Sequence, residues 1–205
     1  MTKKGKLIIL SGPSGTGKST VVFKAMEGRQ DLCFSTSVTT RSPRSGEVNG
    51  REYFFIDQAQ FDRMVENDEL LEHARYVSNS YGTPRPFVEA QLRKGMNVIL
   101  DIEIQGARQV KEKMPEAVAI FMMPPSMSEL RRRLEGRGTD TPEVIEARIA
   151  RAREEIREAD FYDYLILNQD VETAASEFNA IISAEQCRFD PALAKKLTEK
   201  EMIVS

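Results

Sequence analysis

The chain has 205 residues, of which 40% are hydrophobic and 30% are charged, and its formal net charge is −3. This length and composition are typical of an ordinary globular domain with a full hydrophobic core and room for functional insertions. A general nucleic-acid-binding surface would be basic, so we expect no nucleic-acid polymer as a partner. No apolar run approaches the length of a membrane-spanning helix, and we expect no membrane partner either.

Two further features favour a cytoplasmic location. Cys33 and Cys187 are far apart and belong to no Cys-x-x-Cys pair. We interpret them as thiols of a reducing compartment rather than as a disulfide. The charged residues 1–5 lead into an apolar run that is too short for the core of a signal peptide.

The first predicted strand, over residues 7–10, leads directly into a glycine-rich loop in which a helix is predicted to begin. The loop is a complete Gly-x4-Gly-Lys-Ser phosphate loop, and its glycines let successive backbone N–H groups turn toward a phosphate. Lys18 would reach the β- and γ-phosphates, and the Ser19 hydroxyl would ligate Mg²⁺. A plain strand–helix turn would not need this whole pattern, so we predict a nucleoside triphosphate site. Its expected residues are Gly12, Pro13, Ser14, Gly15, Thr16, Gly17, Lys18, Ser19 and Thr20.

Other apolar runs predict four more strands, with helical patterns between several of them. The strands are expected over residues 98–100, 117–122 and 164–167, and near 32–38. Strands that alternate with helices indicate βαβ units and a parallel sheet. We therefore predict an α/β fold of the phosphate-loop NTPase type, a parallel sheet flanked by helices. Its core is expected to comprise residues 1–38, 86–123 and 160–190.

Residues 39–85 interrupt this alternation with turn signals at residues 42–43, 45–46, 49–50 and 82–84. Strand-like runs cover residues 52–56 and 70–77, and one helix is expected near residues 58–66. Asn49-Gly50 suits a tight hairpin turn, because both positions tolerate a positive φ. The segment predicts a small, mostly β insertion.

Two arginines, Arg41 and Arg44, flank Pro43 at the start of this insertion. The proline prevents a helix, so both guanidinium groups can be held in an extended turn. Their forked donors suit a phosphate dianion. Such a run is more often a solvated loop, but its position directly after a predicted core strand favours a phosphate clamp.

Residues 124–159 predict a second insertion of two charged helices, over residues 128–134 and 141–159. The break between them is Gly136-Arg137-Gly138, and eight arginines lie in residues 131–157 among interleaved acids. The pair is either a solvated surface hairpin or a mobile lid that carries arginines over a phosphate site. The phosphate loop favours the lid.

The order of the motifs along residues 6–168 resembles that of guanylate kinases, which belong to the phosphate-loop nucleoside monophosphate kinases. The motifs beside the phosphate loop are Thr39-Thr40-Arg41-x-Pro43-Arg44-x-Gly46-Glu47, Gly50-x-x-Tyr53-x-Phe55, Tyr81-Gly82-Thr83, Leu100-Asp101-Ile102-x-x-Gln105-Gly106 and Leu134-x-Gly136-Arg137-Gly138. The resemblance implies transfer of the γ-phosphoryl group of ATP to GMP, giving ADP and GDP, with Mg²⁺ as the cofactor. It makes residues 39–85 the GMP-binding region.

The resemblance also implies which residues bind GMP. Glu72 can accept hydrogen bonds from N1–H and the N2 amino group of guanine, whereas adenine carries an acceptor at N1. A polar group that the wrong base leaves unpaired can favour the correct base by up to about four orders of magnitude in specificity. The residues implied for the GMP phosphate are Arg41, Arg44, Tyr53 and Tyr81, and those for guanine are Ser37, Glu72 and Thr83.

Two acids and several basic or polar residues complete the implied site. Asp101 follows a predicted strand in the position of a Walker-B acid, where it would orient Mg²⁺ through water beside GMP. Glu103 matches a family acid on the guanine side that is often Asp. No general base is needed, because an ionised phosphate of GMP is already the nucleophile. The implied catalytic residues are Lys18, Arg41, Arg137 and Arg148, with Arg133 as a further candidate, and Asn168 is implied near the adenine of ATP.

Two alternatives stay open at this level. A non-catalytic guanylate kinase-like module would bind phosphopeptides, but such modules typically lose the phosphate loop, whereas this chain keeps Lys18 and Ser19. A kinase for another small acceptor is the second alternative, and Glu72 with the paired arginines favours GMP over it. Residues 191–205 suit a short helix on the core, a tail, or a subunit contact of a homo-oligomer.

Overall fold

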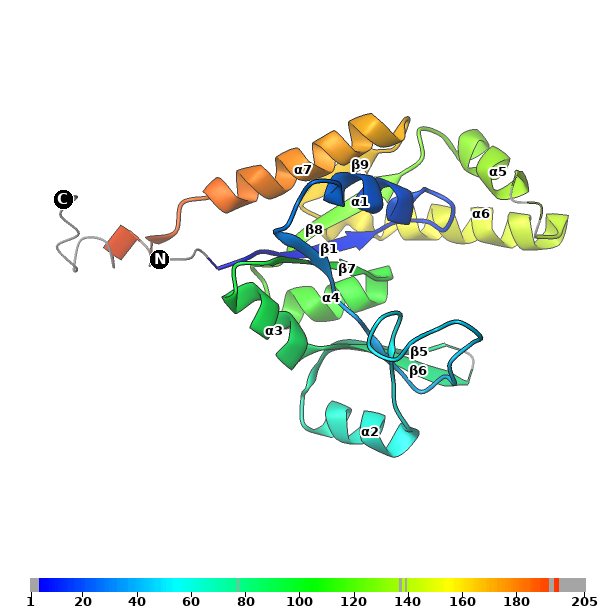
Figure 1. Cartoon of the computed structure of the whole chain (residues 1–205). Helices are drawn as coiled ribbons and strands as arrows, with labels where there is room; N and C mark the ends of the chain where they lie inside the picture. The colour runs from blue at the N-terminus through cyan, green and yellow to red at the C-terminus, as the bar shows by residue number, and fades with distance from the viewer. Residues whose placement is uncertain (1–3, 77, 137, 139, 192–193, 196–205) are drawn as a thin grey trace.

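Five parallel strands form the central sheet of the protein, in the order β2-β7-β1-β8-β9 (Figure 1). The computed structural model describes residues 4–76, 78–136, 138, 140–191 and 194–195. All five residues of β1 are buried, as expected of a strand covered on both faces. The predicted parallel α/β fold is confirmed. The strands are β1 (Leu7–Ser11), β2 (Leu32–Phe34), β7 (Asn97–Asp101), β8 (Val118–Met123) and β9 (Tyr164–Leu167).

Helices cover both faces of this sheet (Figure 1). Successive residues of β1 point to opposite faces, so Ile8 packs in one core cluster with Phe178, and Ile9 packs in the other with Leu92. Both clusters are fully apolar and position the carboxyl ends of the strands. The covering helices are α1 (Lys18–Met26) and α7 (Val171–Cys187) on one face, and α3 (Arg85–Arg93) and α4 (Ile104–Lys113) on the other.

A second sheet lies below the first in Figure 1, in the order β4-β3-β6-β5. One helix, α2 (Gln58–Glu66), packs on it through Phe61, and a capping box between Asp57 and Gln60 begins this helix. The helix predicted near residues 58–66 is therefore confirmed. The strands are β3 (Val38–Thr39), β4 (Phe54–Phe55), β5 (Leu70–Tyr76) and β6 (Asn79–Pro84).

Three local predictions in this region are wrong. The strand expected near residues 32–38 is divided, because β2 pairs with β7 while β3 belongs to the second sheet. Asn49-Gly50 is not a hairpin turn: only Gly50 has a positive φ, and the flanking strands β3 and β4 run parallel. The turn expected at residues 82–84 lies within β6, whose long-range pairing with β5 outweighs the local glycine and proline signals.

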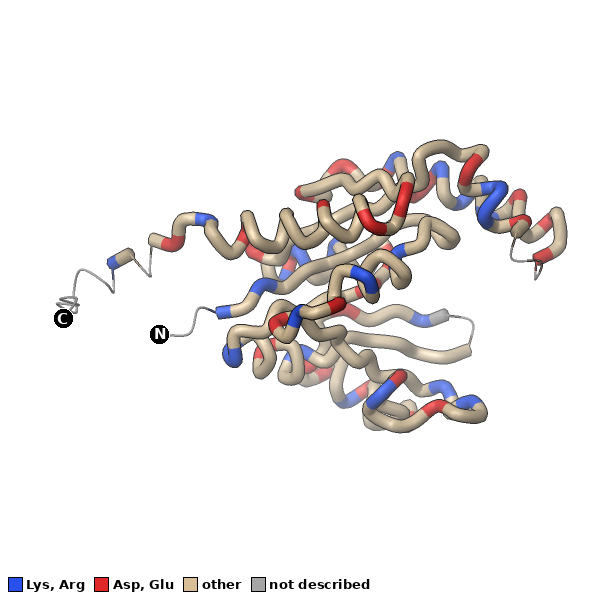
Figure 2. The backbone as a smooth tube through the Cα atoms, turned by 45° about the horizontal axis from the view of Figure 1, so that its top comes forward, with Lys and Arg blue, Asp and Glu red and all other residues tan. Residues whose placement is uncertain are grey.

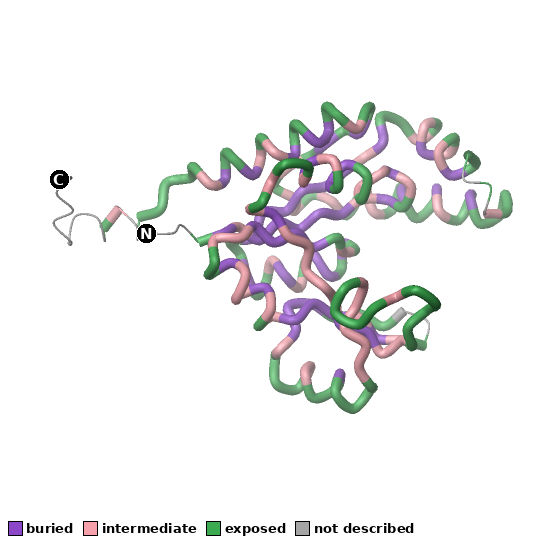
Figure 3. The backbone as a smooth tube through the Cα atoms, in the orientation of Figure 1, coloured by how far each residue is buried: buried purple, intermediate pink, exposed green. Residues whose placement is uncertain are grey.

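The charged helices α5 (Met127–Glu135) and α6 (Pro142–Arg157) project from the main sheet on the side where its strands end (Figure 1). Basic and acidic residues are interleaved along both of them (Figure 2). Their facing sides are nevertheless apolar and buried (Figure 3), because leucine, isoleucine and alanine recur at helical spacing. The helix pair therefore has a small core of its own, formed by Leu130, Leu134, Ile145, Ile149 and Ala152.

The carboxyl end of α7, at Cys187, lies on the opposite side of the molecule from α5 and α6 (Figure 1). Of residues 191–205, the structure describes 191, 194 and 195. A membrane-spanning helix is not found among the described parts of the chain, because none of their helices combines sufficient length with sufficient apolarity.

Candidate functional site

The phosphate loop connects β1 to α1 in a conformation that requires glycine. Gly12, Gly15 and Gly17 all have a positive φ. A Cβ atom on Gly12 would lie 2.1 Å from the carbonyl oxygen of Met122 in the neighbouring strand, so no other residue fits there. Helix α1 begins directly at Lys18. Its first-turn N–H groups and the positive end of its dipole favour an anion at this loop.

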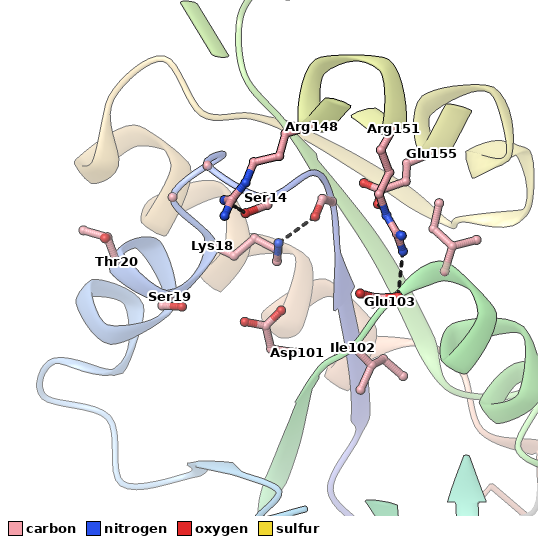
Figure 4. Close-up of a pocket in the computed structure, with 14 residues that line it drawn as sticks. Ser14, Lys18, Ser19, Thr20, Asp101, Ile102, Glu103, Arg148, Arg151 and Glu155 are labelled. Atoms are coloured by element: carbon pink, nitrogen blue, oxygen red, sulfur yellow. Dashed lines mark hydrogen bonds and ion pairs between the residues drawn. The ribbon is translucent and has the colours of Figure 1, made fainter. Parts of the chain in front are cut away.

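A cavity of about 410 Å³ lies over this loop (Figure 4). It is bounded on one side by the loop and on the other by the end of β7 and by α6. Phosphate-loop residues thus share one opening with an acid from the sheet and with arginines from the projecting helices. The lining residues are Gly12, Ser14, Gly15, Gly17, Lys18, Ser19, Thr20, Asp101, Ile102, Glu103, Ile104, Arg148, Arg151 and Glu155.

The ammonium group of Lys18 is held within the loop. Its Nζ donates to the carbonyl oxygen of Gly12 at 2.6 Å and, more weakly, to that of Pro13 at 3.5 Å. Across the cavity, the protein around Asp101 raises the pKa of this carboxyl by desolvation, although its side chain is exposed to the opening. The positive charge of Lys18 opposes that rise.

The donor set in the cavity fits Mg²⁺ bound together with a nucleotide. Ser19 offers a hydroxyl and Asp101 a carboxylate, and both line the opening beside Lys18 (Figure 4). Among the described residues, no group of three or more His, Cys, Asp or Glu side chains could hold a metal ion by itself. Mg²⁺ in nucleotide enzymes is typically held by one or two protein groups, with phosphates and water as the other ligands.

Asn168 supports the phosphate loop from below. Its side chain is buried, and Nδ2 donates to the carbonyl oxygen of Thr16 at 2.7 Å. Arg133 of α5 donates to the same oxygen at 3.2 Å and to the carbonyl oxygen of Asn168 at 2.9 Å. Glu129 accepts from Arg133 at 2.7 Å, and the guanidinium groups of Arg132 and Arg133 lower the pKa of Glu129 to about 2. These contacts join α5, the loop and the end of β9.

Helix α6 also reaches the phosphate loop. The guanidinium of Arg148 donates to the Ser14 hydroxyl at 3.1 Å and to Asp140 at 3.5 Å (Figure 4). The cation is therefore at the cavity that would hold phosphates. Arg137, the other predicted lid arginine, lies outside the described residues.

On the second sheet, Glu72 of β5 is buried beside Thr83 of β6. The Thr83 hydroxyl donates to Glu72 Oε1 at 2.6 Å, and the two residues are 0% and 7% exposed, respectively. Burial raises the pKa of Glu72, the nearby charge of Glu103 adds to the rise, and the hydrogen bond from Thr83 opposes it. Gly106 of α4 makes room for this carboxylate, because a Cβ there would lie 3.0 Å from Oε2.

A smaller cavity of about 220 Å³ lies between the two sheets. Ser37 and Thr83 line it together with Tyr53, and so does Asp101, which also lines the cavity over the phosphate loop. The two cavities therefore adjoin at the end of β7.

Arg41 lies in a cluster with Glu47 and two tyrosines. Its guanidinium makes paired hydrogen bonds to the Glu47 carboxylate at 2.9 and 3.0 Å and lies 5.5 Å from the ring centre of Tyr53. Tyr53 and Tyr81 meet edge to face at 5.9 Å. The backbone N–H of Arg44 donates to the same carboxylate at 2.7 Å, while its side chain is exposed. Glu47 raises the pKa of Arg41, and Arg41 lowers that of Glu47.

Sequence reasoning did not single out the residues that Arg41 and the cavity use as partners. Glu47 belongs to a quoted motif, but nothing marked it as the acid that orients Arg41. Arg151 and Glu155 line the phosphate-loop cavity with Arg148. Their spacing of three and seven residues from Arg148 places all of them on one face of a helix, a signal that could have identified them.

The sequence is similar to guanylate kinases over nearly its whole length. A family model described as guanylate kinase matches residues 4–185. The guanylate kinase of Lactococcus lactis subsp. lactis is 48% identical over 195 residues, which are 95% of this chain and 95% of that protein. The guanylate kinase of Bacillus cereus is 51% identical over 189 residues, which are 91% of this chain and 92% of that protein.

Solved structures agree with the sequence comparison. The crystal structure of guanylate kinase from Anaplasma phagocytophilum superimposes with a TM-score of 0.74 at 37% identity, covering 100% of each chain. The SH3-kinase fragment of tight junction protein 3 superimposes with a TM-score of 0.50 at 11% identity, covering 90% of this chain and 58% of that one. The second likeness shows the fold alone. The family model and the close relatives show more: the chain belongs to the guanylate kinase family.

Proposed function

We propose that this protein transfers the γ-phosphoryl group of ATP to GMP, giving ADP and GDP. One observation carries the proposal: a complete phosphate loop lines one cavity, Thr83 of a buried glutamate–threonine pair lines a second, and the two cavities adjoin at Asp101. The loop suits a triphosphate, and the pair suits the Watson–Crick edge of guanine. Family membership supports the same reaction.

On the donor side, the phosphate loop would hold the ATP phosphates. Lys18 would leave its carbonyl partners in the loop for the β- and γ-phosphates, and Arg148 would bring a second cation from α6. Mg²⁺, when bound with ATP, would neutralise charge on the β- and γ-phosphate oxygens, with Ser19 as a ligand and Asp101 acting through water. Asn168 would act by holding the loop beneath the nucleotide.

On the acceptor side, Glu72 would accept from N1–H and the N2 amino group of guanine. Ser37 and Thr83 would complete base recognition from the walls of the smaller cavity, and Glu103, which lines the phosphate-loop cavity, would add an acid near Glu72. The GMP phosphate would bind to the arginine–tyrosine cluster, where Glu47 holds the Arg41 fork in a fixed orientation. The residues proposed for that phosphate are Arg41, Arg44, Tyr53 and Tyr81.

We also propose a separate role for each part of the chain. Residues 1–38, 86–123 and 160–190 form the core, residues 39–85 bind GMP, and residues 124–159 close over ATP as a lid. Closure excludes water, which would otherwise accept the phosphoryl group. Cys33 and Cys187 are free thiols, in keeping with a reducing cytoplasm.

Release of ADP from ATP with Mg²⁺ tests the proposal directly, with GMP, AMP, dTMP, UMP and shikimate offered separately as acceptors. We expect turnover with GMP and background rates with the others. Turnover with a different acceptor would contradict the roles of Glu72 and Arg41. If folded protein binds ATP but uses none of the acceptors, a phosphopeptide-binding module is the better interpretation.

A further inference from the structure

An ion pair between Arg151 and Glu103 crosses the open cleft between α6 and the core. Arg151 Nη2 donates to Glu103 Oε2 at 2.9 Å, and its Nε donates to Glu155 Oε1 at 3.0 Å (Figure 4). The cleft has a volume of about 520 Å³, and residues of α6 form one wall while Glu103, Ile104 and Gln105 form the other. Across this cleft, α6 is therefore joined to the core by an ion pair and not by apolar packing.

The two ends of α6 are held differently. At its carboxyl end, Arg108 of α4 donates to the carbonyl oxygen of Glu158 at 3.0 Å and lies 4.3 Å from the ring centre of Phe161. Arg151 is seven residues before Glu158, a distance of about 10 Å along a helix. Arg148 lies one turn further from this fixed end and touches Ser14. A rotation of α6 about its carboxyl end would therefore move Arg151 and Arg148 together.

Glu103 connects this movement of α6 to the proposed guanine site. Glu103 occupies the N-cap position of α4 without a capping hydrogen bond from its side chain, and Gly106 of this helix packs against the Glu72 carboxylate. Burial is the main cause of the raised pKa of Glu72, and the negative charge of Glu103 adds to the rise. A guanidinium docked on Glu103 offsets that negative charge, which favours the ionised Glu72 that guanine requires.

We propose that Arg151 and Glu103 form a latch through which the two substrate sites favour each other's occupation, an inference that rests on the proposed ATP and GMP sites. Bound ATP holds α6 over the phosphate loop through Arg148 and thereby keeps Arg151 on Glu103. Bound GMP favours the same position of α6 from the other side, because coupling between two sites is reciprocal. Arg151 and Glu103 act as positioning residues, and neither is assigned to the transferred group.

The size of the effect follows from the exposure of the pair. The side chains of Arg151 and Glu103 are 60% and 69% exposed. Exposed ion pairs of this kind change an equilibrium by about 1.5- to 5-fold and weaken with salt. The latch is therefore expected to modulate substrate coupling and not to be required for turnover.

A double-mutant cycle tests the latch. GMP binding is measured by calorimetry with and without a non-hydrolysable β,γ-imido ATP analogue and Mg²⁺, in the wild type, Arg151→Gln, Glu103→Gln and the double variant. We expect the analogue to raise GMP affinity in the wild type. Each single variant should reduce that enhancement by about 1.5- to 5-fold, and the double variant should reduce it no further. The exchanged pair Glu103→Lys with Arg151→Glu should recover part of it.

A matched control is the exposed pair Glu89 and Arg93 on α3, with 3.5 Å between the charged atoms. Its removal should leave the enhancement unchanged. Additive losses in the cycle, or no enhancement in the wild type, would overturn the latch. It would also be overturned if Arg151→Gln, but not Glu103→Gln, weakened binding of the analogue alone, since Arg151 would then contact the nucleotide. Phosphoryl transfer to GMP is assayed in parallel, because its absence in the wild type refutes the proposed function instead.

Discussion

Glu72 is a carboxylate that the fold buries before any ligand arrives. Its hydrogen bond from Thr83 compensates only part of the desolvation, so its pKa stays raised. A buried acceptor that is incompletely paired is poised for the two donors of guanine. The same property that makes the site selective is expected to lower the stability of the empty protein.

Replacing Glu72 by Gln tests its role in recognition. Loss of charge-assisted hydrogen bonds to N1–H and the N2 amino group should raise the KM for GMP by about 10- to 100-fold. Binding of ATP should stay unchanged, because Glu72 lines no part of the phosphate-loop cavity. Steady-state kinetics in GMP and calorimetry with an ATP analogue measure the two effects. Equal weakening of both substrates would contradict the assignment.

The same variant has an expected signature in thermal stability. The pKa of Glu72 is higher in the folded than in the unfolded protein, so the folded state binds the proton more tightly. Its ionisation therefore costs stability as the pH rises from the unfolded value of about 4.3 through the folded pKa. The difference in Tm, Glu72→Gln minus wild type, should therefore be more positive at about pH 7 than at about pH 4. Glu116→Gln, at a carboxylate whose side chain is 63% exposed, is the control and should show no such trend.

Lys18 donates hydrogen bonds to two carbonyl oxygens of the phosphate loop and would exchange them for phosphate oxygens when ATP binds. Lys18→Ala should reduce turnover by about 10²-fold or more, because it removes a cation from developing negative charge. Lys24→Ala is a matched control on the same helix, where Lys24 pairs with Glu27 and Glu172 away from the cavity. Its turnover should stay within about 2-fold of the wild type. A comparable loss in both variants would point to a damaged helix.

At the scale of elements, α5 and α6 form a unit with its own core. Ile149 is 3% exposed in that core, whereas Val144 on the same helix is 41% exposed. Ile149→Ala should destabilise the helix pair by about 2–4 kcal/mol, and Val144→Ala should stay within about 0.5 kcal/mol.

Hydrogen exchange separates a local effect from a global one. Peptides from residues 127–157 should exchange faster in Ile149→Ala, while those of β1, β7 and β8 should keep their protection. Turnover should fall with the loss of an ordered lid. Faster exchange throughout the sheet would mean that the helix pair is part of the main core after all.

At the scale of the whole molecule, the second sheet lies below the main sheet and the helix pair projects beyond the ends of its strands (Figure 1). A compact chain of this length would have a radius of gyration of about 17 Å, and the projecting parts should raise that of the empty protein. A bisubstrate analogue that links adenosine to guanosine through phosphates should lower it, because both parts close on one ligand. X-ray scattering measures the change. An unchanged radius with bound analogue would exclude closure of that size.

The sequence alone predicted most of the fold and many elements of the candidate site. Buried strands need continuous apolar runs, and a phosphate loop needs its glycines, so a short stretch of sequence is enough to predict either one. The predictions failed where pairing between distant segments decides the outcome. Residues 82–84 carry turn signals, yet they lie within β6 because β5 and β3 pair with this strand on either side.

The sequence likewise indicated which residue types carry the chemistry, but it did not indicate their burial or their partners. The resemblance identified Glu72, Arg41 and Arg148, whereas only the tertiary structure shows the buried carboxylate, its Thr83 partner and the Glu47 that orients Arg41. Arg151 meets Glu103 from 48 positions away, and no local pattern encodes such a pair. Local backbone geometry and apolar periodicity depend on neighbours in the chain, so the sequence determined them directly. Burial, charge pairing and the joining of two cavities depend on neighbours in space, so only the folded molecule decided them.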